Sequence, residues 1–458
     1  MPIATINPAT GETVETFTPA TDAQVDDAIA RAYARFLDYR RSTTFAQRAQ
    51  WANATADLLE QESDRTAAML TLEMGKTLAS AKAEVLKCAK GFRYYAENAE
   101  ALLADEPADA KTVGAAQAYL RYQPLGVVLA VMPWNFPLWQ AVRFAAPALM
   151  AGNVGILKHA SNVPRTALYL ADVIARGGFP DGCFQTVLVS ASAVERILRD
   201  PRVAAATLTG SEPAGQSVGA ICGDEIKPTV LELGGSDPFI VMPSAPLADA
   251  VEMAVKARIQ NNGQSCIAAK RFIVHTDIYE PFVEAFVDRM RSLTVGDPTE
   301  PGTDVGPLAT ESARDEVAQQ VVDAVAAGAV VRCGGTVPEG PGWFYPPTVI
   351  TDITDDMELY TAEIFGPVAS IYRAAGIDEA IDIANATPFG LGATAWTQDE
   401  AEQRRFIDEI EAGQVFINGL TVSFPELGFG GIKRSGYGRE LAAAGIRTFC
   451  NAKTVWIA

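Results

Sequence analysis

The protein has 458 residues, a length that predicts two or three domains, because a single hydrophobic core rarely grows so large. Hydrophobic residues make up 48% of the chain and charged residues 20%, as in soluble globular proteins. The formal net charge of −19 argues against binding to nucleic acid or to an anionic membrane, since both need a positive surface. An anionic substrate would need its own local cation.

The start of the chain, MPIATINPATGE, lacks the basic segment and apolar run of a secretory signal, and no apolar run reaches membrane-spanning length. We therefore expect a cytoplasmic protein. The cysteines are far apart and only two histidines are present, so neither a disulfide framework nor a Cys- or His-rich metal site is expected. The scarcity of histidine favours a different base for any reactive cysteine.

The first hundred residues are predicted to be mostly helical. Apolar residues recur at three- and four-residue spacing over 21–40 and 45–76, which is the pattern of amphipathic helices. Alternation over 116–123 predicts a strand of a hairpin.

Short apolar strands alternate with helices from Gln123 to Gly235. Strands are predicted in PLGVVLAVMP, NVGILKHA, CFQTVLVS, VAAATLTG and KPTVLELGG, and helices near 192–199 and 213–223. This alternation predicts an α/β fold with a parallel, doubly wound sheet. A second alternation begins after Gly235 and includes a long helix over 246–262. The apolar ending TVWIA is predicted to complete another subunit's sheet.

The segment NNGQSCIAAKR contains the first candidate for chemistry, Cys266. Most lone cysteines are small buried hydrophobes, and we interpret the other five in that way. Cys266 differs because amides and a hydroxyl precede it, as in a turn whose backbone N–H groups face a reacting oxygen. A thiolate needs such a partly polar setting to form and to attack, so Cys266 is a candidate nucleophile.

Two further polar residues follow predicted strands. Glu232, in VLELGG, either caps the turn or accepts a proton from water at the edge of the sheet where ligands bind. Asn135, in PWNFP, is either a turn-forming asparagine or an amide donor for a developing oxyanion.

The segment TLTGSEPAG (207–215) follows a strand and opens a helix. Gly210 and Gly215 allow close backbone approach, and a helix N-terminus favours a phosphate. An ordinary strand–helix turn is the alternative, because the segment is not G-x-G-x-x-G.

Taken together, the motifs resemble the aldehyde dehydrogenase superfamily over nearly the whole chain. Their order and the spacing between Glu232 and Cys266 support the resemblance more than any single motif does. The matching motifs are LEMGK (72–76), PWNFP (133–137), the lysine of ILKHAS, TGSEPAG, LELGG (231–235), GQSC (263–266), EIFGPV (363–368) and FGGIKRSGYGRE (429–440).

The resemblance implies three structural parts and a homodimer or homotetramer. They are a doubly wound dinucleotide-binding domain, an α/β catalytic domain and a small β oligomerisation element. The implied boundaries are 1–111 and 123–234 for the first, 235–435 for the second, and 112–122 and 436–458 for the third.

The resemblance also implies a covalent mechanism. Cys266 would attack an aldehyde carbon to give a thiohemiacetal, whose oxyanion the Asn135 amide and the Cys266 backbone N–H would hold. Hydride would leave for the nicotinamide, and Glu232 would activate the water that releases the acid from the resulting thioester.

A nicotinamide dinucleotide is the implied cofactor. Lys158 resembles the lysine that bonds the adenosine ribose, and Glu363 the residue that holds the nicotinamide ribose, with Phe365 beside it. Ser161 stands where the family often has a glutamate that would repel a 2′-phosphate, so NADP is favoured over NAD, with Lys158 and His159 as phosphate partners. The other implied cofactor contacts are Trp134, Gly210, Ser211, Gly215 and Leu233.

For the aldehyde, Arg143 and Ser423 resemble residues with which succinate-semialdehyde dehydrogenases bind the substrate carboxylate. Gln260 stands where some of these enzymes have a second arginine, and Arg258 could assist instead. We therefore expect oxidation of succinic semialdehyde to succinate. Ile267 and Ala268 follow Cys266, so no neighbouring-disulfide switch is expected.

Three alternatives remain at this point. The first is a dehydrogenase of another short aldehyde, such as glutaric semialdehyde. The second is a thiol esterase or acyltransferase that uses Cys266 and Glu232, which would have no need of Lys158 or Glu363. The third is a binding protein, which would not need Cys266, Glu232 and Asn135 together.

Overall fold

The N-terminal quarter of the chain is helical, as the sequence predicts. The computed structural model describes residues 2–458. Thr21 and Thr44 begin the first two helices with capping boxes, in which hydroxyl and glutamine side chains satisfy backbone N–H groups. The first elements are β1 (Ala4–Ile6), β2 (Thr13–Thr16), α1 (Asp22–Ser42), α2 (Phe45–Gln61), α3 (Ser63–Met74) and α4 (Leu78–Leu102).

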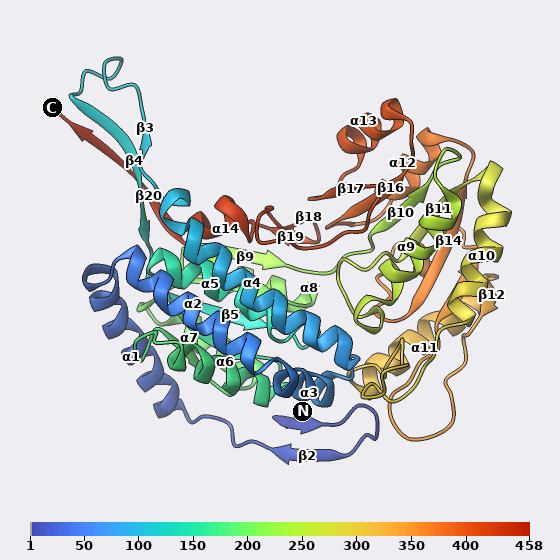
Figure 1. Ribbon diagram of the computed structural model, residues 1–458, viewed down its shortest axis with the longest axis horizontal. Coiled ribbons are helices and arrows are strands. Elements are labelled where there is room, and N and C mark those ends of the chain that lie inside the picture. The colour runs from blue at the N-terminus through green and yellow to red at the C-terminus, as the bar shows by residue number, and fades with distance from the viewer. Residues whose placement is uncertain (1) are drawn as a thin grey trace.

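A first large sheet has the strand order β19-β9-β8-β5-β6-β7, and its strands are parallel except for β19. Its apolar residues share one core with α1, α2 and α4 (Figure 1). The strands are β5 (Val127–Met132), β6 (Val154–His159), β7 (Phe184–Thr186), β8 (Val203–Thr209), β9 (Thr229–Glu232) and β19 (Gly436–Tyr437). The helices between them are α5 (Trp139–Ala151), α6 (Pro164–Arg176), η1 (Ala191–Ala193), α7 (Val194–Arg199) and α8 (Glu212–Asp224).

A second large sheet has the strand order β12-β13-β14-β11-β10-β16-β17, in which only β12 is antiparallel. Separate apolar clusters cover its two faces. The strands are β10 (Pro238–Val241), β11 (Arg271–His275), β12 (Val330–Cys333), β13 (Thr348–Thr351), β14 (Val368–Ala374), β16 (Ala393–Trp396) and β17 (Val415–Ile417). The helices are α9 (Leu247–Ile259), η2 (Gln260–Gly263), η3 (Thr276–Ile278), α10 (Tyr279–Arg291), α11 (Glu311–Ala326), η4 (Glu358–Tyr360), α12 (Ile377–Asn385) and α13 (Glu400–Glu409).

These two sheets confirm the predicted α/β fold with parallel sheets. A short pair, β15 (Phe389–Gly390) and β18 (Ile432–Lys433), leads towards β19 and α14 (Ala442–Thr448). Within residues 2–458, no helix combines the length and the apolarity needed to cross a membrane.

The helix predicted over 246–262 ends earlier than expected. α9 stops at Ile259, and Asn261 and Asn262 adopt left-handed backbone angles, with φ of 56° and 58°. Asparagine tolerates this conformation better than most residues. The paired asparagines therefore turn the chain sharply just before Cys266, which periodicity alone did not indicate.

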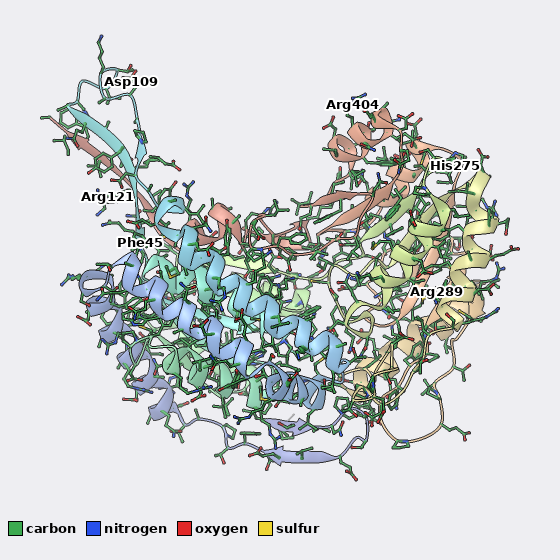
Figure 2. All side chains as sticks on the ribbon, in the orientation of Figure 1. Phe45, Asp109, Arg121, His275, Arg289 and Arg404 are labelled. Carbon is green, nitrogen blue, oxygen red and sulfur yellow. The ribbon has the colours of Figure 1, made fainter. Side chains whose placement is uncertain are left out.

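A three-stranded arm projects from the body (Figure 1). β20 (Cys450–Ile457) pairs antiparallel with β4 (Gln117–Pro124), and β3 (Glu106–Pro107) pairs with the other edge of β4. The C-terminal strand thus pairs with its own chain along one edge, and the expectation that it also completes another subunit's sheet stays a prediction for its other edge. Within the segment 436–458, β19 joins the first large sheet and α14 packs on α5, and only β20 belongs to the arm. Figure 2 shows Arg121 on β4 and Asp109 near the tip of the arm.

Candidate active site

The three candidate catalytic residues lie at the ends of secondary-structure elements whose backbones meet. Asn135 follows β5, Glu232 ends β9, and Cys266 follows η2. The Asn135 side chain donates from Nδ2 to the carbonyl oxygen of Gln264 at 3.1 Å. A Cβ on Gly235 would lie only 2.7 Å from the Cys266 carbonyl oxygen, so the segment after Glu232 contacts the Cys266 loop directly. The structure therefore brings the three segments together.

The left-handed asparagines hold this loop in place. Asn261 donates from Nδ2 to the carbonyl oxygens of Asn135 at 2.7 Å and Gln264 at 3.0 Å. Asn262 donates to the carbonyl oxygens of Gly75 and Pro307. Both side chains are buried, so the bonds form away from competing water. The polar residues before Cys266 thus fix the loop to three other parts of the chain.

Gly263 lets the Cys266 loop touch the EIFGPV segment backbone to backbone. A Cβ at Gly263 would lie 2.3 Å from the carbonyl carbon of Gly366, and its φ is +77°. Any side chain would therefore force the two segments apart.

Lys270 is a site residue that sequence reasoning missed. Its buried Nζ donates to the carbonyl oxygens of Ser265 at 2.7 Å and Cys266 at 2.6 Å, and lies 3.2 Å from Glu363 Oε1. The available signal was a lysine among small apolar residues just after the cysteine. Burial raises the pKa of the Cys266 thiol to about 12, and Lys270 and Arg143 partly offset this effect. The thiol is protonated at neutral pH, so it needs a base to react.

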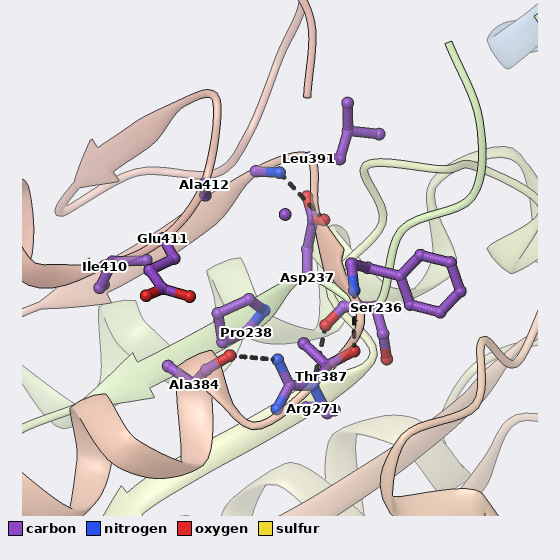
Figure 3. Close-up of a pocket in the computed structure, with 13 residues that line it drawn as sticks. Ser236, Asp237, Pro238, Arg271, Ala384, Thr387, Leu391, Ile410, Glu411 and Ala412 are labelled. Atoms are coloured by element: carbon purple, nitrogen blue, oxygen red, sulfur yellow. Dashed lines mark hydrogen bonds between the residues drawn. The ribbon is translucent and has the colours of Figure 1, made fainter. Parts of the chain in front are cut away.

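Hydrogen bonds anchor the segment that follows Glu232 beside the Cys266 loop. Asp237 Oδ1 accepts a bond from the Gly392 backbone N–H at 3.1 Å, and Arg271 donates to the carbonyl oxygens of Ser236 and Ala384 (Figure 3). Burial raises the pKa of Asp237 to about 7, with Lys270 opposing the shift. This buried network ties the segment just before β10 to the residue before β16, and the start of β11 to the end of α12.

Glu232 is a buried carboxyl without a hydrogen-bond partner among residues 2–458. Burial raises its pKa, and the negative charge of Glu440 raises it further, whereas Arg143 and Arg439 lower it. A carboxylate with a raised pKa is a stronger base than an ordinary glutamate once it is ionised.

Arg143 does not occupy the open position that we predicted for a substrate ligand. It is 2% exposed and forms an ion pair with Glu440, while Nη2 donates to Thr209 Oγ1 at 3.3 Å. Its guanidinium lies over the Phe429 ring, 4.4 Å from the ring centroid. Every residue of α5 is buried, so helical spacing could not decide which face met the substrate. The charge of Arg143 is already matched inside the protein.

Ser423 is nearly buried and accepts two hydrogen bonds. Trp139 donates from Nε1 at 2.9 Å, and Lys87 donates from Nζ at 2.8 Å. Lys87 was also missed by sequence reasoning, because no motif surrounds it. The available signal was its position between Glu84 and Cys88, on the buried side of α4.

Two buried glutamates accept hydrogen bonds from the first N–H groups of two helices that support the site. Glu84 accepts bonds from the backbone N–H groups of Leu138 and Trp139 at the start of α5, and it pairs with Lys76. Glu73 accepts bonds from the N–H groups of Arg165 and Thr166 at the start of α6. The LEMGK motif therefore supplies Glu73, whose buried carboxylate complements the N-terminus of α6, and Lys76, which pairs with Glu84. Sequence reasoning recognised this motif only by resemblance.

At the end of β6, the neighbouring residues Lys158 and His159 have different surroundings. Lys158 has no ion-pair partner among residues 2–458, and burial lowers its pKa. His159 lies 2.8 Å from the Pro137 carbonyl oxygen through Nε2, and its Nδ1 accepts from the Ala160 N–H. Burial lowers the pKa of His159 to about 4. The expected phosphate-binding role of His159 is therefore wrong, because its ring is neutral and both nitrogens are used. Ser161 is half-buried.

The remaining predicted cofactor residues fall into two groups. At the turn into α8, Ser211 occupies the N-cap position without a side-chain cap, which leaves helix N–H groups available. A Cβ on Gly215 would lie 2.5 Å from Leu233 Cδ2, so this glycine permits helix–strand packing, while a Cβ on Gly210 would only touch Leu208 Cδ2 at 3.7 Å. Elsewhere, Trp134 and Phe365 make an edge-to-face contact with centroids 5.7 Å apart.

Comparison with known proteins confirms the class that this fold and site indicate. The model of the aldehyde dehydrogenase family matches residues 1–455, and the chain belongs to that family. A protein of Mycobacterium avium (strain 104) named succinate-semialdehyde dehydrogenase [NADP(+)] is 83% identical over 457 residues, covering 100% of this chain and 97% of that protein. A protein of Mycobacterium tuberculosis (strain ATCC 25618 / H37Rv) named succinate-semialdehyde dehydrogenase [NADP(+)] 1 is 80% identical over 458 residues, covering 100% of both chains.

A solved structure is similar over almost the full length. The succinic semialdehyde dehydrogenase from Streptococcus pyogenes, in complex with NADP+ as the cofactor, superimposes with a TM-score of 0.97. It is 37% identical, and the match covers 99% of each chain. The predicted aldehyde-dehydrogenase-like fold is thereby confirmed.

Proposed function

We propose that the protein oxidises succinic semialdehyde to succinate with NADP. The observation that carries this proposal is that the segments bearing Cys266, Asn135 and Glu232 contact one another in a chain that the family model matches over residues 1–455. Its relatives at 80% and 83% identity have that activity in their names. Family membership favours this reaction over the thiol esterase and binding-protein alternatives.

Cys266 forms the covalent bond. The thiol gives its proton to solvent water, the resulting thiolate adds to the aldehyde carbon, and the carbonyl oxygen becomes a negatively charged oxyanion. Asn135 is held beside the loop by its bond to Gln264, and its amide has a second N–H that can donate to this oxyanion. The Cys266 backbone N–H is the second donor. When it is bound, the nicotinamide accepts the hydride that leaves the carbon.

Glu232 releases the product. The thioester carbon remains bonded to Cys266 until water attacks it, and the ionised Glu232 carboxylate takes the proton of that water. The attack forms the succinate carboxyl group and returns the thiol. Because burial disfavours the charge on Glu232, the carboxylate is basic enough for this step.

The residues present fit an NADP molecule. Lys158 is a cation without a counter-ion among residues 2–458, and the N-terminus of α8 has unused N–H groups. Both features suit phosphate groups, in a protein whose net charge would otherwise repel them. Lys158 would hold the adenosine side, with Ser161 leaving room for a 2′-phosphate, and Glu363 would hold the nicotinamide ribose.

Ser161→Glu is expected to move cofactor preference from NADP towards NAD. The new carboxylate would repel the 2′-phosphate, and like charges at a binding site cost enough to lower the NADP/NAD ratio of kcat/KM about tenfold or more. Steady-state kinetics with both cofactors measure that ratio. Ser190→Glu, at an exposed serine, is the matched control. An unchanged ratio in Ser161→Glu would place cofactor selection elsewhere.

The direct test of the proposed reaction is absorbance of the reduced nicotinamide with three aldehydes and both cofactors. Succinic semialdehyde with NADP should give the highest kcat/KM. Glutaric semialdehyde reports on chain length, and butanal reports on the carboxylate. A protein that prefers butanal, or oxidises no aldehyde, would contradict the proposal.

The arm is proposed to hold subunits together in a homodimer or homotetramer. Its last strand has an unpaired edge, and Trp456 and Val113 are 53% and 52% exposed. An exposed edge with large apolar side chains favours pairing with another chain.

Trp456→Glu is expected to shift the protein to smaller species, because it places a charge in the proposed contact. Light scattering coupled to size exclusion at micromolar concentration measures the mass. Val322→Glu changes an equally exposed apolar residue on α11 and should leave the mass unaltered. An identical mass for wild type and Trp456→Glu would argue against a role of the arm.

A further inference from the structure

The carboxylate end of the substrate needs a cation that the predicted residue does not provide. Arg143 is buried and paired with Glu440. Arg258 is fully buried and donates to the Gly263 carbonyl oxygen at 2.7 Å. Both side chains were candidates from the sequence, and both are enclosed. Because the proposed substrate is an anion and the protein is strongly acidic, another positive group must face it.

Lys87 is a cation without a partner of opposite charge. Within residues 2–458 no carboxylate lies within ion-pair distance of its Nζ, because Glu84, one turn earlier on α4, pairs with Lys76. The ammonium instead contacts Ser423 Oγ at 2.8 Å and lies 4.5 Å from the centroid of the Trp139 ring. A hydroxyl and an aromatic face orient the ammonium without neutralising it.

Lys87 lines a cavity whose wall includes a chain neighbour of Asn135 and a hydrogen-bond partner of the residue after Cys266. The cavity has a volume of about 310 Å³, and Phe136, Gln260 and Asn261 also line it. Phe136 directly follows Asn135 in the chain. Gln260 donates from Nε2 to the carbonyl oxygen of Ile267, the residue after Cys266, at 3.3 Å. Two wall residues of this cavity are thus linked directly to the proposed oxyanion site, one by a peptide bond to Asn135 and one by a hydrogen bond to the residue after Cys266.

We propose that Lys87, together with the Ser423 hydroxyl, binds the carboxylate of the aldehyde substrate and thereby selects short anionic aldehydes. This inference rests on the proposed function and adds the group that provides charge selectivity. Ser423 was predicted to contact the carboxylate, and Lys87 replaces Arg143 as its cationic partner. The carboxylate supplies the counter-charge that Lys87 lacks.

The protonation of Lys87 supports this assignment. Burial and, to a smaller extent, the positive charge of Arg143 lower its pKa to about 8. The lysine is therefore charged below about pH 8 and loses its charge above that value. The other charged or titratable groups that act on it or share its cavity are Glu84, Cys88, Lys90, Lys256 and Asp304.

The test compares succinic semialdehyde with butanal, which has the same number of carbons but no charge. In Lys87→Met, kcat/KM for succinic semialdehyde should fall about 30-fold, mainly through KM, because a desolvated charge pair is lost. The value for butanal should change less than about threefold. Lys87→Arg should keep most of the preference for the anion.

Matched controls separate this site from general charge effects. Lys90→Met removes a lysine from the exposed side of α4, where Lys90 pairs with Glu426, and should behave as wild type. Lys256→Met tests the other lysine of the cavity. Equal losses for the two aldehydes in Lys87→Met, or a selective loss in Lys256→Met instead, would overturn the assignment. If Lys87→Met does not fold, Lys87→Gln provides the same comparison.

The pH dependence gives a second, independent readout. The ratio of kcat/KM for succinic semialdehyde to that for butanal should fall as pH rises above about 8, because Lys87 loses its charge. The titration of Glu232 affects both aldehydes and cancels in the ratio. In Lys87→Arg the ratio should stay level, since guanidinium remains charged. A wild-type ratio that does not change with pH would contradict the proposal.

Failure of this inference is distinguishable from failure of the proposed function. If wild-type protein does not oxidise succinic semialdehyde, the function is wrong whatever Lys87 does. If wild type oxidises it and Lys87→Met does so equally well, only the role of Lys87 is wrong. Binding of succinate to the protein, measured by calorimetry, should weaken about 30-fold in Lys87→Met and be unaffected in Lys90→Met.

Discussion

Replacing Cys266 with alanine is expected to abolish turnover, with kcat lower by about 10⁴-fold or more, because the variant has no nucleophile to hold the aldehyde carbon. Cofactor absorbance at saturating aldehyde measures this loss. Cofactor affinity, measured by fluorescence, should change little. Mass spectrometry of quenched wild-type protein should find the acyl group on Cys266 and none in the variant.

Cys333→Ala is the matched control, because Cys333 is also half-buried but lies on β12 of the second large sheet. It should retain wild-type kcat. Substantial turnover by Cys266→Ala would mean that the reaction has no covalent step on this residue. The proposed mechanism would then be wrong even if the substrate were correct.

Glu232→Gln should separate the two halves of the reaction. The amide fills the same space but cannot take a proton from water, so hydrolysis of the thioester should slow about 10²- to 10⁴-fold. Hydride transfer needs no hydrolysis, and one equivalent of reduced cofactor should form rapidly per active site. Stopped-flow absorbance records this burst and the slow phase that follows.

The pH profile gives a further check on Glu232. Because burial and Glu440 raise its pKa, the active carboxylate form increases as pH rises past the ordinary range of glutamate. In wild type the rate of acid release should increase with pH across this range, and in Glu232→Gln the increase should disappear. A variant with an unchanged steady-state rate would remove Glu232 from its assigned step.

Much of the architecture was predictable because it follows local patterns. Alternating strands and helices indicated the parallel sheets, and the position of Asn135 and Glu232 after predicted strands made them candidates for the site. The end of the helix after Ile259 was not predicted, because a few polar residues such as Gln260 and Asn261 are compatible with the exposed face of a continuing helix. There the buried hydrogen bonds of Asn261 and Asn262 outweigh helical propensity.

The charged residues of the site were the hardest to assign from sequence. Arg143 stood at a matching position, but its long side chain turns towards Glu440, far along the chain. His159 was considered as a phosphate ligand, yet burial leaves it neutral. Lys87 and Lys270 gave no motif signal. In each case the outcome depends on which distant group meets the side chain, and a linear pattern does not contain that information.

The contact between Gly263 and Gly366 has a consequence for engineering. With no side chain between these two stretches of main chain, rotamer changes cannot absorb a displacement of either one. The loop that bears Cys266 and the segment that bears Glu363 therefore keep a fixed position relative to each other. A loop transplanted from a relative would have to bring both stretches at once. Exchanging one alone would misplace Cys266 relative to the nicotinamide ribose that Glu363 is proposed to hold.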